Sequence, residues 1–333
     1  FHGCGAFELE NGKIEKKEVR ATFSDAFGDA ICELAERDSK IIAITAAMPD
    51  GTKLSKFAKQ FPQRYFDVGI AEAHAVCFAA GAAAAGLRPI CAIYSTFLQR
   101  AYDQIVHDVV VQNLPVIFCL DRAGVVGDDG PTHMGLYDIA YLRALPGMTI
   151  MAPRNEAELL PMLEHALKLN APVAIRYPRG STSRVGEAAP SPIAQGHAEV
   201  LRRGSGAAIL ALGNAVEVAL DAYDMLAADG GAELPTVVNM RFAKPLDGAL
   251  LVELAQAHDR FLTLEEHALA GGFGSAVVEF VSDRRLEVRV ERIGAPDLLI
   301  QHDAQAKQRA QFGLHAKNVA ARVARVLVAP VRP

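Results

Sequence analysis

The chain has 333 residues, of which 51% are hydrophobic and 22% are charged, a balance typical of a globular protein with room for two domains. A formal net charge of −5 gives no reason to expect a nucleic acid or an anionic membrane as a partner. No apolar run reaches the roughly 20 residues of a membrane-spanning helix. The five cysteines form an odd number without metal-binding spacing, which favours buried thiols in a reducing compartment.

Strands and helices alternate through the first half of the chain. Phe1–Lys17 is rich in glycine and charge, which predicts a linker arm over residues 1–18. Apolar residues recur at helical spacing over Arg20–Arg37, with Thr22 or Ser24 available as the cap. The strands predicted next are Ile41–Thr45, Tyr65–Val68, Pro89–Tyr94, Pro115–Leu120, Thr149–Ala152 and Val173–Tyr177. The helices predicted between them are Ala73–Ala85, Phe97–Val111, Asp138–Leu145 and Asn155–Leu169, the last capped by Asn155.

A second alternating unit follows a break in this pattern. Ser181–Gly204 has no sustained period, which predicts a linker over residues 181–204 between a domain at 19–180 and a smaller one at 205–333. The second unit is predicted to contain the strands Ala207–Leu212, Thr236–Met240, Phe261–Leu264 and Val288–Ile293 and the helices Val216–Leu226, Asp247–Ala257 and Phe273–Val281. The alternation predicts two doubly wound α/β domains, each with a mostly parallel sheet. Glu265, Glu266 and His267 are the few candidates for chemistry in the second unit, with the solvated end of a strand as the alternative interpretation.

One carboxylate stands at the turn where a short strand meets an alanine-rich helix. Glu72 precedes Ala73–Ala85, a helix otherwise made almost entirely of small apolar residues. Ligand sites in parallel α/β sheets lie at the carboxyl ends of the strands. Glu72 is therefore either a ligand-binding group or a carboxylate that interacts with the positive end of the helix dipole.

Several arginines also fall at predicted strand ends. Arg122 and Arg179, together with Arg176 or Arg100, are expected to surround one rim of the first sheet. Because the planar guanidinium group suits bidentate contacts to phosphate, the group favours a small phosphorylated ligand. The alternative is that each arginine pairs with a nearby aspartate, as Arg122 could with Asp121 or Asp128.

Three separated stretches, YSTFLQRAYDQIVHDVVVQNLPV, DRAGVVGDDGPTHMG and RYPRG, carry a family resemblance. They resemble the 1-deoxy-D-xylulose-5-phosphate synthases, thiamine-diphosphate enzymes of the transketolase superfamily. The resemblance continues through EEHALAGGFGS and IGAPD, so it covers nearly the whole chain. It implies a pyrimidine-binding domain followed by a transketolase-type carboxyl-terminal domain.

The resemblance assigns cofactor and catalytic roles to particular residues. Glu72 matches the glutamate that hydrogen-bonds the aminopyrimidine ring of thiamine diphosphate, and Phe97 matches the aromatic residue that stacks on that ring. Ile70 is assigned to the same cofactor site. His133 and His2 match histidines at the reacting centre, although His2 lies in a short motif at the chain terminus.

The same resemblance assigns residues to the substrates. Tyr94, Arg122 and Arg179 match positions that hold the phosphate of the acceptor aldehyde. Arg100 and Asp129, with His133, match residues around the donor substrate. The reaction implied is the decarboxylation of pyruvate and the transfer of its remaining two carbons to D-glyceraldehyde 3-phosphate. Its product, 1-deoxy-D-xylulose 5-phosphate, begins the non-mevalonate isoprenoid route.

No metal ligand is predicted in this chain. The run GDDG at residues 127–130 imitates the superfamily's metal and diphosphate motif, which belongs to a different domain. The Mg²⁺ ligands are expected in an amino-terminal domain, in the same or a separate chain, and this chain alone is not expected to turn over. A homodimer in the bacterial cytoplasm, or in a plastid if the source is a plant, is the assembly that the resemblance implies.

Two other interpretations stay open. A β-type subunit of a 2-oxo-acid dehydrogenase, or a split transketolase subunit, has the same length and domain pair. Neither is expected to combine FLQRAYDQ, DRAG and PRG, and a dehydrogenase component needs no phosphate site. The second interpretation is a catalytically silent partner subunit, against which the joint presence of Glu72, Arg122 and His133 argues.

Overall fold

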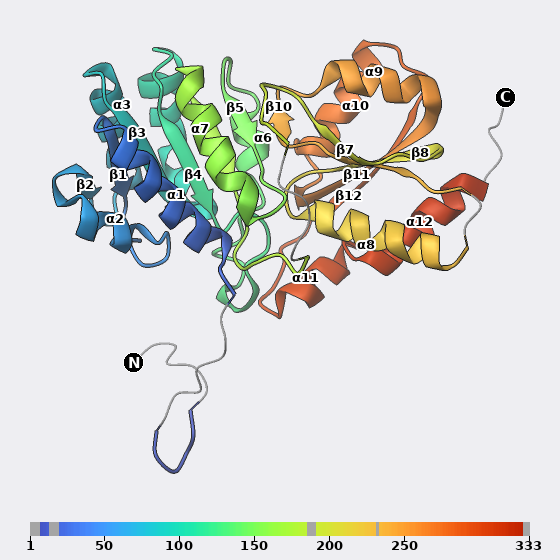
Figure 1. Ribbon diagram of the computed structural model, residues 1–333, viewed down its shortest axis with the longest axis horizontal. Helices are drawn as coiled ribbons and strands as arrows, with labels where there is room; N and C mark the ends of the chain where they lie inside the picture. The colour runs from blue at the N-terminus through green and yellow to red at the C-terminus, as the bar shows by residue number, and fades with distance from the viewer. Residues whose placement is uncertain (1–6, 13–19, 185–190, 231–232, 329–333) are drawn as a thin grey trace.

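Two mostly parallel sheets organise the chain in the computed structural model, which describes residues 7–12, 20–184, 191–230 and 233–328 (Figure 1). The first sheet has seven strands in the order β10-β5-β6-β4-β3-β1-β2 and the second has five in the order β12-β11-β8-β9-β7. The strands of the first half are β1 (Ile41–Thr45), β2 (Tyr65–Asp67), β3 (Arg88–Tyr94), β4 (Ile117–Asp121), β5 (Thr149–Met151) and β6 (Val173–Arg176). Those of the second half are β7 (Glu199–Arg202), β8 (Gly206–Ala211), β9 (Thr236–Asn239), β10 (Phe242–Lys244), β11 (His258–Ala268) and β12 (Arg289–Ala295). The predicted fold class is confirmed.

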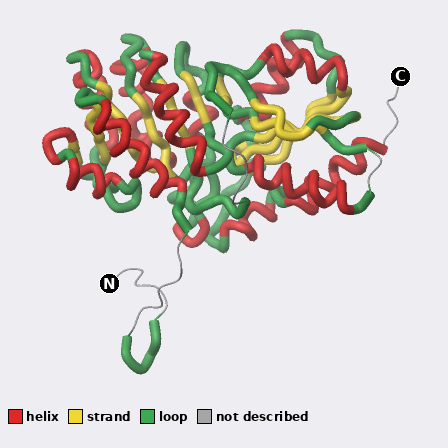
Figure 2. The backbone as a smooth tube through the Cα atoms, viewed as in Figure 1, coloured by secondary structure: helices red, strands yellow, loops and turns green. Residues whose placement is uncertain are grey.

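Helices (red) lie on both sides of each sheet (yellow strands) in Figure 2. The longer helices of the first half are α1 (Phe23–Arg37), α2 (Leu54–Gln60), α3 (Glu72–Ala84), α6 (Asp138–Leu142) and α7 (Leu159–Leu169). Those of the second half are α8 (Ala215–Ala228), α9 (Gly248–Ala257), α10 (Phe273–Asp283), α11 (Gln305–Gln311) and α12 (Ala316–Val328). One core lies under α1 and α7, another under α8 and α12. Since parallel strands are buried on both faces, they read as continuous apolar runs.

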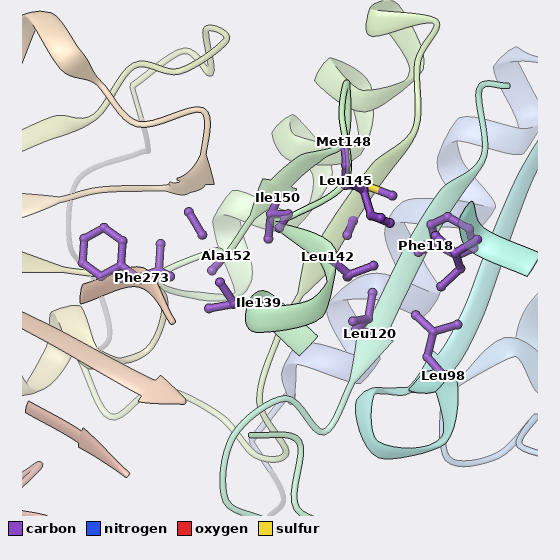
Figure 3. Packing of buried hydrophobic residues seen from close by; sticks show 14 of the residues in the cluster. Leu98, Phe118, Leu120, Ile139, Leu142, Leu145, Met148, Ile150, Ala152 and Phe273 are labelled. Atoms are coloured by element: carbon purple, nitrogen blue, oxygen red, sulfur yellow. The ribbon is translucent and has the colours of Figure 1, made fainter. Parts of the chain in front are cut away.

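The two halves share a hydrophobic core. One cluster runs from the face of the first sheet under α3, through α6, to α9 and α10 of the second half. Figure 3 follows it from Leu98 and Phe118 through Ile139 and Leu142 to Phe273 of α10. The second half also contributes β10, which pairs antiparallel with β5 at the edge of the first sheet. The halves are therefore joined by burial and by strand pairing, neither of which the sequence predicted.

The segment predicted as one helix over Phe97–Val111 is broken, so that prediction is wrong in detail. It forms α4 (Ser95–Leu98), a 3₁₀ turn (η2, Gln99–Ala101), α5 (Tyr102–Gln104) and π-helical turns (η3, Ile105–Val110). The wide turns are closed by bonds from residue i+5 to residue i, as from Val111 N to Val106 O at 2.9 Å. Such turns cluster at functional sites and here keep Ile105 and Val109 in the core.

The structure also decides two predictions about helix caps. The Thr22 hydroxyl caps α1 by accepting from Asp25 N at 3.1 Å, which decides between Thr22 and Ser24. Asn155 does not cap α7, because a 3₁₀ turn (η5, Glu156–Glu158) intervenes and the Asn155 side chain makes no capping bond. In place of an Asn155 cap, the Glu158 carboxylate accepts from Arg154 N at 2.8 Å.

The interpretation of Glu265, Glu266 and His267 as a solvated strand end is wrong. Their exposed fractions are 0%, 1% and 0%, and all three lie within β11. Burial is tolerated because each is hydrogen-bonded. Glu265 accepts from Phe273 N at 2.6 Å and Gly274 N at 2.8 Å at the start of α10, and His267 Nε2 accepts from Ile139 N at 3.1 Å.

The burial of Glu265 is expected to make the stability of the protein depend measurably on pH. Burial raises the pKa of Glu265 from 4.5 to about 7. Between these values the folded protein holds a proton that the unfolded chain has released, so the free energy of unfolding falls as pH rises from 4.5 to 7. Relative to the Glu265→Gln variant, the unaltered protein is expected to lose about 3 kcal/mol across this window, measured by urea unfolding.

His267, whose Nδ1 lies 3.8 Å from Glu265 Oε2, contributes with the opposite sign. Burial lowers the pKa of His267 to about 4, so its contribution to stability rises with pH up to its ordinary pKa of 6.5. The exposed Glu287→Gln variant in the same domain is the control and should follow the unaltered protein. Parallel curves for Glu265→Gln and the unaltered protein would contradict the prediction.

Within the described residues, no helix is both long and apolar enough to cross a membrane.

Candidate active site

The carboxyl ends of five parallel strands meet at one edge of the first sheet. β2, β1, β3, β4 and β6 are neighbours in that order and all run in the same direction. Glu72, Tyr94, Arg122 and Arg179 stand at or just after the ends of β2, β3, β4 and β6. The predicted cofactor carboxylate and the predicted phosphate-binding residues therefore lie at the same edge of the sheet.

Five of the predicted site residues form a continuous row of rings and guanidinium groups. Tyr94 and Phe97 stack with ring centroids 5.7 Å apart, and His133 lies edge-on to Phe97 at 5.2 Å. The Arg122 guanidinium carbon lies 4.0 Å from the centre of the Tyr94 ring, and that of Arg100 lies 5.3 Å from the centre of Phe97. Cation–π contacts of this kind order the side chains without using all the guanidinium donors.

Arg122 is fixed by a buried aspartate. Arg122 Nη1 donates to Asp121 Oδ1 at 2.8 Å and to Gly51 O at 2.9 Å. Asp121 is fully buried and also accepts from Ser24 Oγ at 2.7 Å, and burial raises its pKa. The aspartate partner considered for Arg122 therefore exists, yet both bonds come from one nitrogen. No described residue bonds to its other two nitrogens.

Arg179 is held in a similar way. Its Nη1 donates to Asp129 Oδ2 at 2.7 Å and to Val126 O at 2.9 Å. Its side chain is 43% exposed, and no bond of Nη2 or Nε to a described residue exists. Asp129, assigned by resemblance to the donor substrate, is thus the ion-pair partner of Arg179. Both arginines keep donors that a planar or tetrahedral anion could use.

The charges of both arginines act on the Tyr94 hydroxyl. Burial raises the pKa of the Tyr94 hydroxyl, the positive charge of Arg122 opposes this rise, and the charges of Asp129 and Arg179 also act on it. Gly51 makes room for this hydroxyl, since a Cβ at that position would lie 1.8 Å from Tyr94 Oη. Arg122 therefore lies against Tyr94, and Arg179 is near enough for its charge to act on the same hydroxyl.

Glu72 is a buried residue that bonds to no other described residue. It is the first residue of α3 and only 5% exposed. Its carboxylate makes no capping bond, and no hydrogen bond or ion pair links it to any residue that the structure describes. Neither carboxylate oxygen is among the fully buried polar atoms that lack a partner in the described chain, so the carboxylate end of this side chain is open to a ligand. The absence of a capping bond favours a ligand-binding role over capping. α3 packs against α4 and η2, the turns that carry Phe97 and Arg100.

The turn before Glu72 is held by Asp67. Asp67 Oδ1 accepts from Ala47 N at 2.8 Å and from Gly69 N at 3.0 Å. Ile70, assigned by resemblance to the cofactor site, is 86% exposed at this turn. An apolar side chain so exposed beside an unpartnered carboxylate fits a site that a further group covers.

One predicted residue is not part of this arrangement, and another is not described. His2 lies outside the described residues. Arg176 does not face the rim but is buried, donating to Asp138 Oδ2 at 2.8 Å and to Glu266 O at 3.2 Å. It is the last residue of β6, whose side chains are all buried, whereas Arg179 lies beyond the strand. Of the two alternatives, Arg176 or Arg100, the placement of Arg176 on the rim is therefore wrong.

Sequence reasoning missed Gly51 and Ser24, and it considered Asp121 only as one of two alternative partners of Arg122. The Asp121-Arg122 pair at a strand end was the only signal in the sequence, since Gly51 and Ser24 belong to distant segments. In the described part of the chain, no group of three or more His, Cys, Asp or Glu side chains is placed to hold a metal ion.

Two family profiles match the two halves of the chain. Residues 20–184 match "Transketolase, pyrimidine binding domain" and residues 196–319 match "Transketolase, C-terminal domain". A solved structure described as "Split gene transketolase, inactive beta4 tetramer" is 32% identical, with a TM-score of 0.81, and the match covers 92% of this chain and 98% of that one. The chain belongs to the transketolase family.

Named relatives of this transketolase-family chain are 1-deoxy-D-xylulose-5-phosphate synthases. Synthase 1 of Geobacter sulfurreducens is 51% identical over 100% of this chain and 52% of its own length. The synthase of Heliobacterium modesticaldum is 50% identical over 98% of this chain and 50% of its own length. The chain therefore spans about half the length of these relatives. Transketolase from Campylobacter jejuni, 17% identical with a TM-score of 0.76 over 92% of this chain and 46% of its own, shares the fold.

Proposed function

We propose that this chain supplies the pyrimidine-binding and carboxyl-terminal domains of a 1-deoxy-D-xylulose-5-phosphate synthase. The enzyme would remove CO₂ from pyruvate and join the remaining two carbons to the aldehyde carbon of D-glyceraldehyde 3-phosphate. The observation that carries the proposal is the rim, where Arg122 and Arg179 each keep guanidinium nitrogens that bond to no described residue. Tyr94 and Glu72, whose carboxylate also bonds to no described residue, lie at the same sheet edge. Identity of about half over nearly the whole chain with named synthases supports it.

Thiamine diphosphate is the cofactor that fits this edge. When bound, it supplies the electron sink for loss of CO₂ from a 2-oxo acid. The Glu72 carboxylate, bonded to no described residue, would accept a hydrogen bond from the pyrimidine ring, with Phe97 and Ile70 against the ring faces. The Mg²⁺ ligands are assigned to the amino-terminal domain.

Substrate roles follow from the row of side chains on the rim. The Tyr94 hydroxyl and the guanidinium groups of Arg122 and Arg179 would bind the phosphate of the acceptor. His133 and Arg100 flank Phe97 and would contact pyruvate and move protons at the reacting carbon, with Asp129 beside them. His133 Nδ1 lies 2.9 Å from Thr132 Oγ1, which orients the ring.

A partner chain or an attached amino-terminal domain completes the proposed enzyme. Likeness to a split transketolase subunit over 98% of its length favours a partner chain, and a split transketolase is the second candidate function. The complete enzyme is proposed to be a homodimer of such units. Cys32, Cys91 and Cys119 are buried free thiols, which suits a reducing compartment such as the bacterial cytoplasm or a plastid.

The test supplies an amino-terminal domain from the same source, fused or as a separate chain. Product is expected only when both halves, pyruvate and D-glyceraldehyde 3-phosphate are present, and this chain alone should be inactive. Transfer from a ketose phosphate in place of pyruvate would instead assign a transketolase. Turnover by this chain alone would contradict the division of the site between two halves.

A further inference from the structure

The segment 124–135, here called the rim loop, carries both Asp129 and His133. Its base is closed by backbone bonds between Gly124 and Gly135, at 2.7 and 2.8 Å. Three of its apolar side chains, those of Val125, Val126 and Met134, are buried at 0%, 0% and 4% exposure. They belong to the hydrophobic cluster beneath α8 and α12, so the carboxyl-terminal half supplies the core of a loop that arises in the first half.

Two glutamines of α11 form hydrogen bonds with the backbone of the rim loop. Gln308 is fully buried; its Oε1 accepts from Gly127 N at 2.9 Å and its Nε2 donates to Gly127 O at 3.0 Å. The same Nε2 reaches Gln301 O at 2.9 Å. Gln305 Nε2 donates to Val125 O at 2.8 Å and to Arg179 O at 3.2 Å. One amide therefore pairs both backbone groups of Gly127, as a neighbouring strand would.

Glu266 of β11 provides a third attachment. Its Oε1 accepts from Val125 N at 2.8 Å, while Arg309 Nε donates to its Oε2 at 2.8 Å and Asn214 donates to the same oxygen. Gly124 has a φ of 101°, and a Cβ there would lie 2.6 Å from Glu266 Oε1. The carboxylate thus occupies the space that the glycine leaves.

We propose that Gln308 is a positioning residue that sets where the rim loop holds Asp129 and His133, with Gln305 and Glu266 as its supports. This inference rests on the proposed function for its catalytic consequence, because Asp129 and His133 are assigned to the reacting centre there. The loop needs an outside constraint, since Gly127 and Gly130 both have a φ of 76°, in a region where glycine adds little stiffness. Its position also governs Arg179, which bonds to Val126 O and Asp129.

The test compares Gln308→Ala and Gln308→Met with the unaltered chain. Methionine keeps most of the buried volume but has no amide, so it separates packing from hydrogen bonding. Hydrogen exchange of peptides covering 124–130 is expected to accelerate by about tenfold or more in both variants, while exchange in β1 and β4 stays unchanged. In the complete enzyme, kcat corrected for the folded fraction should fall on the order of 10- to 100-fold.

Gln311→Ala is the matched control, because Gln311 lies on the same helix and is exposed. It should leave both exchange and kcat unchanged. Unchanged exchange in Gln308→Met would overturn the inference, since packing alone would then hold the loop. Faster exchange with an unchanged kcat would overturn its catalytic consequence. If the unaltered complete enzyme lacks synthase activity, the proposed function fails, and the exchange data alone support or overturn the positioning of the loop.

Discussion

Replacing Glu72 by glutamine is expected to lower the kcat of the complete enzyme on the order of 10²- to 10⁴-fold, the range lost when a positioned proton-transfer group is removed. The side chain lies at the start of α3, and its carboxylate is bonded to no described residue, which leaves it available to the proposed cofactor. Glutamine keeps the shape but not the charge. Steady-state turnover and calorimetric binding of thiamine diphosphate measure the loss.

Stability separates this role from a structural one. Because Glu72 bonds to no described residue, Glu72→Gln should leave the melting temperature unchanged. Glu36→Gln, the same change at an exposed position of α1, is the control and should alter neither property. A variant that keeps full activity, or that loses activity because it unfolds, would remove Glu72 from the proposed site.

Replacing Arg179 by methionine is expected to raise the KM for D-glyceraldehyde 3-phosphate about 10- to 100-fold, with little change in the KM for pyruvate. The loss of one charge-assisted hydrogen bond, about 1.5–3 kcal/mol, sets this range. Nη2 and Nε of Arg179 are bonded to no described residue and so remain available to an acceptor phosphate. Initial rates with each substrate varied in turn provide the measurement.

Two further variants sharpen that result. Arg179→Lys keeps the charge but not the planar fork, and an intermediate KM is expected. Arg203→Met removes an exposed arginine paired with Glu253 in the second half, and both KM values should stay unchanged. Equal effects of Arg179→Met on both substrates would exclude Arg179 from the phosphate site.

The fold class was predictable because its signal is local. The apolar runs at Ile41–Thr45 and Val173–Tyr177 correspond closely to β1 and β6, since strands buried on both faces read as unbroken apolar segments. The helix predicted over Phe97–Val111 failed because propensity does not report a π-helical turn. That turn keeps the side chains of both Ile105 and Val109 in the core.

The site was predictable in part. The sequence placed Glu72, Tyr94, Arg122 and Arg179 at strand ends, and parallel pairing brings strand ends to one edge. It did not show that Arg176, three residues before Arg179, points inward to Asp138. Nor did it show which nitrogens of Arg122 are already used, because Gly51 is 71 residues away.

By itself, the sequence determined the alternation of elements, the two α/β domains and the family resemblance, all of which depend on residues close together in the chain. Only the tertiary structure decided that Glu265, Glu266 and His267 are buried and that α11 holds the loop bearing Asp129 and His133. The contact from Gln308 to Gly127 spans 181 residues. Burial and hydrogen bonding across such a separation depend on how the two halves pack, which no local pattern of residues encodes.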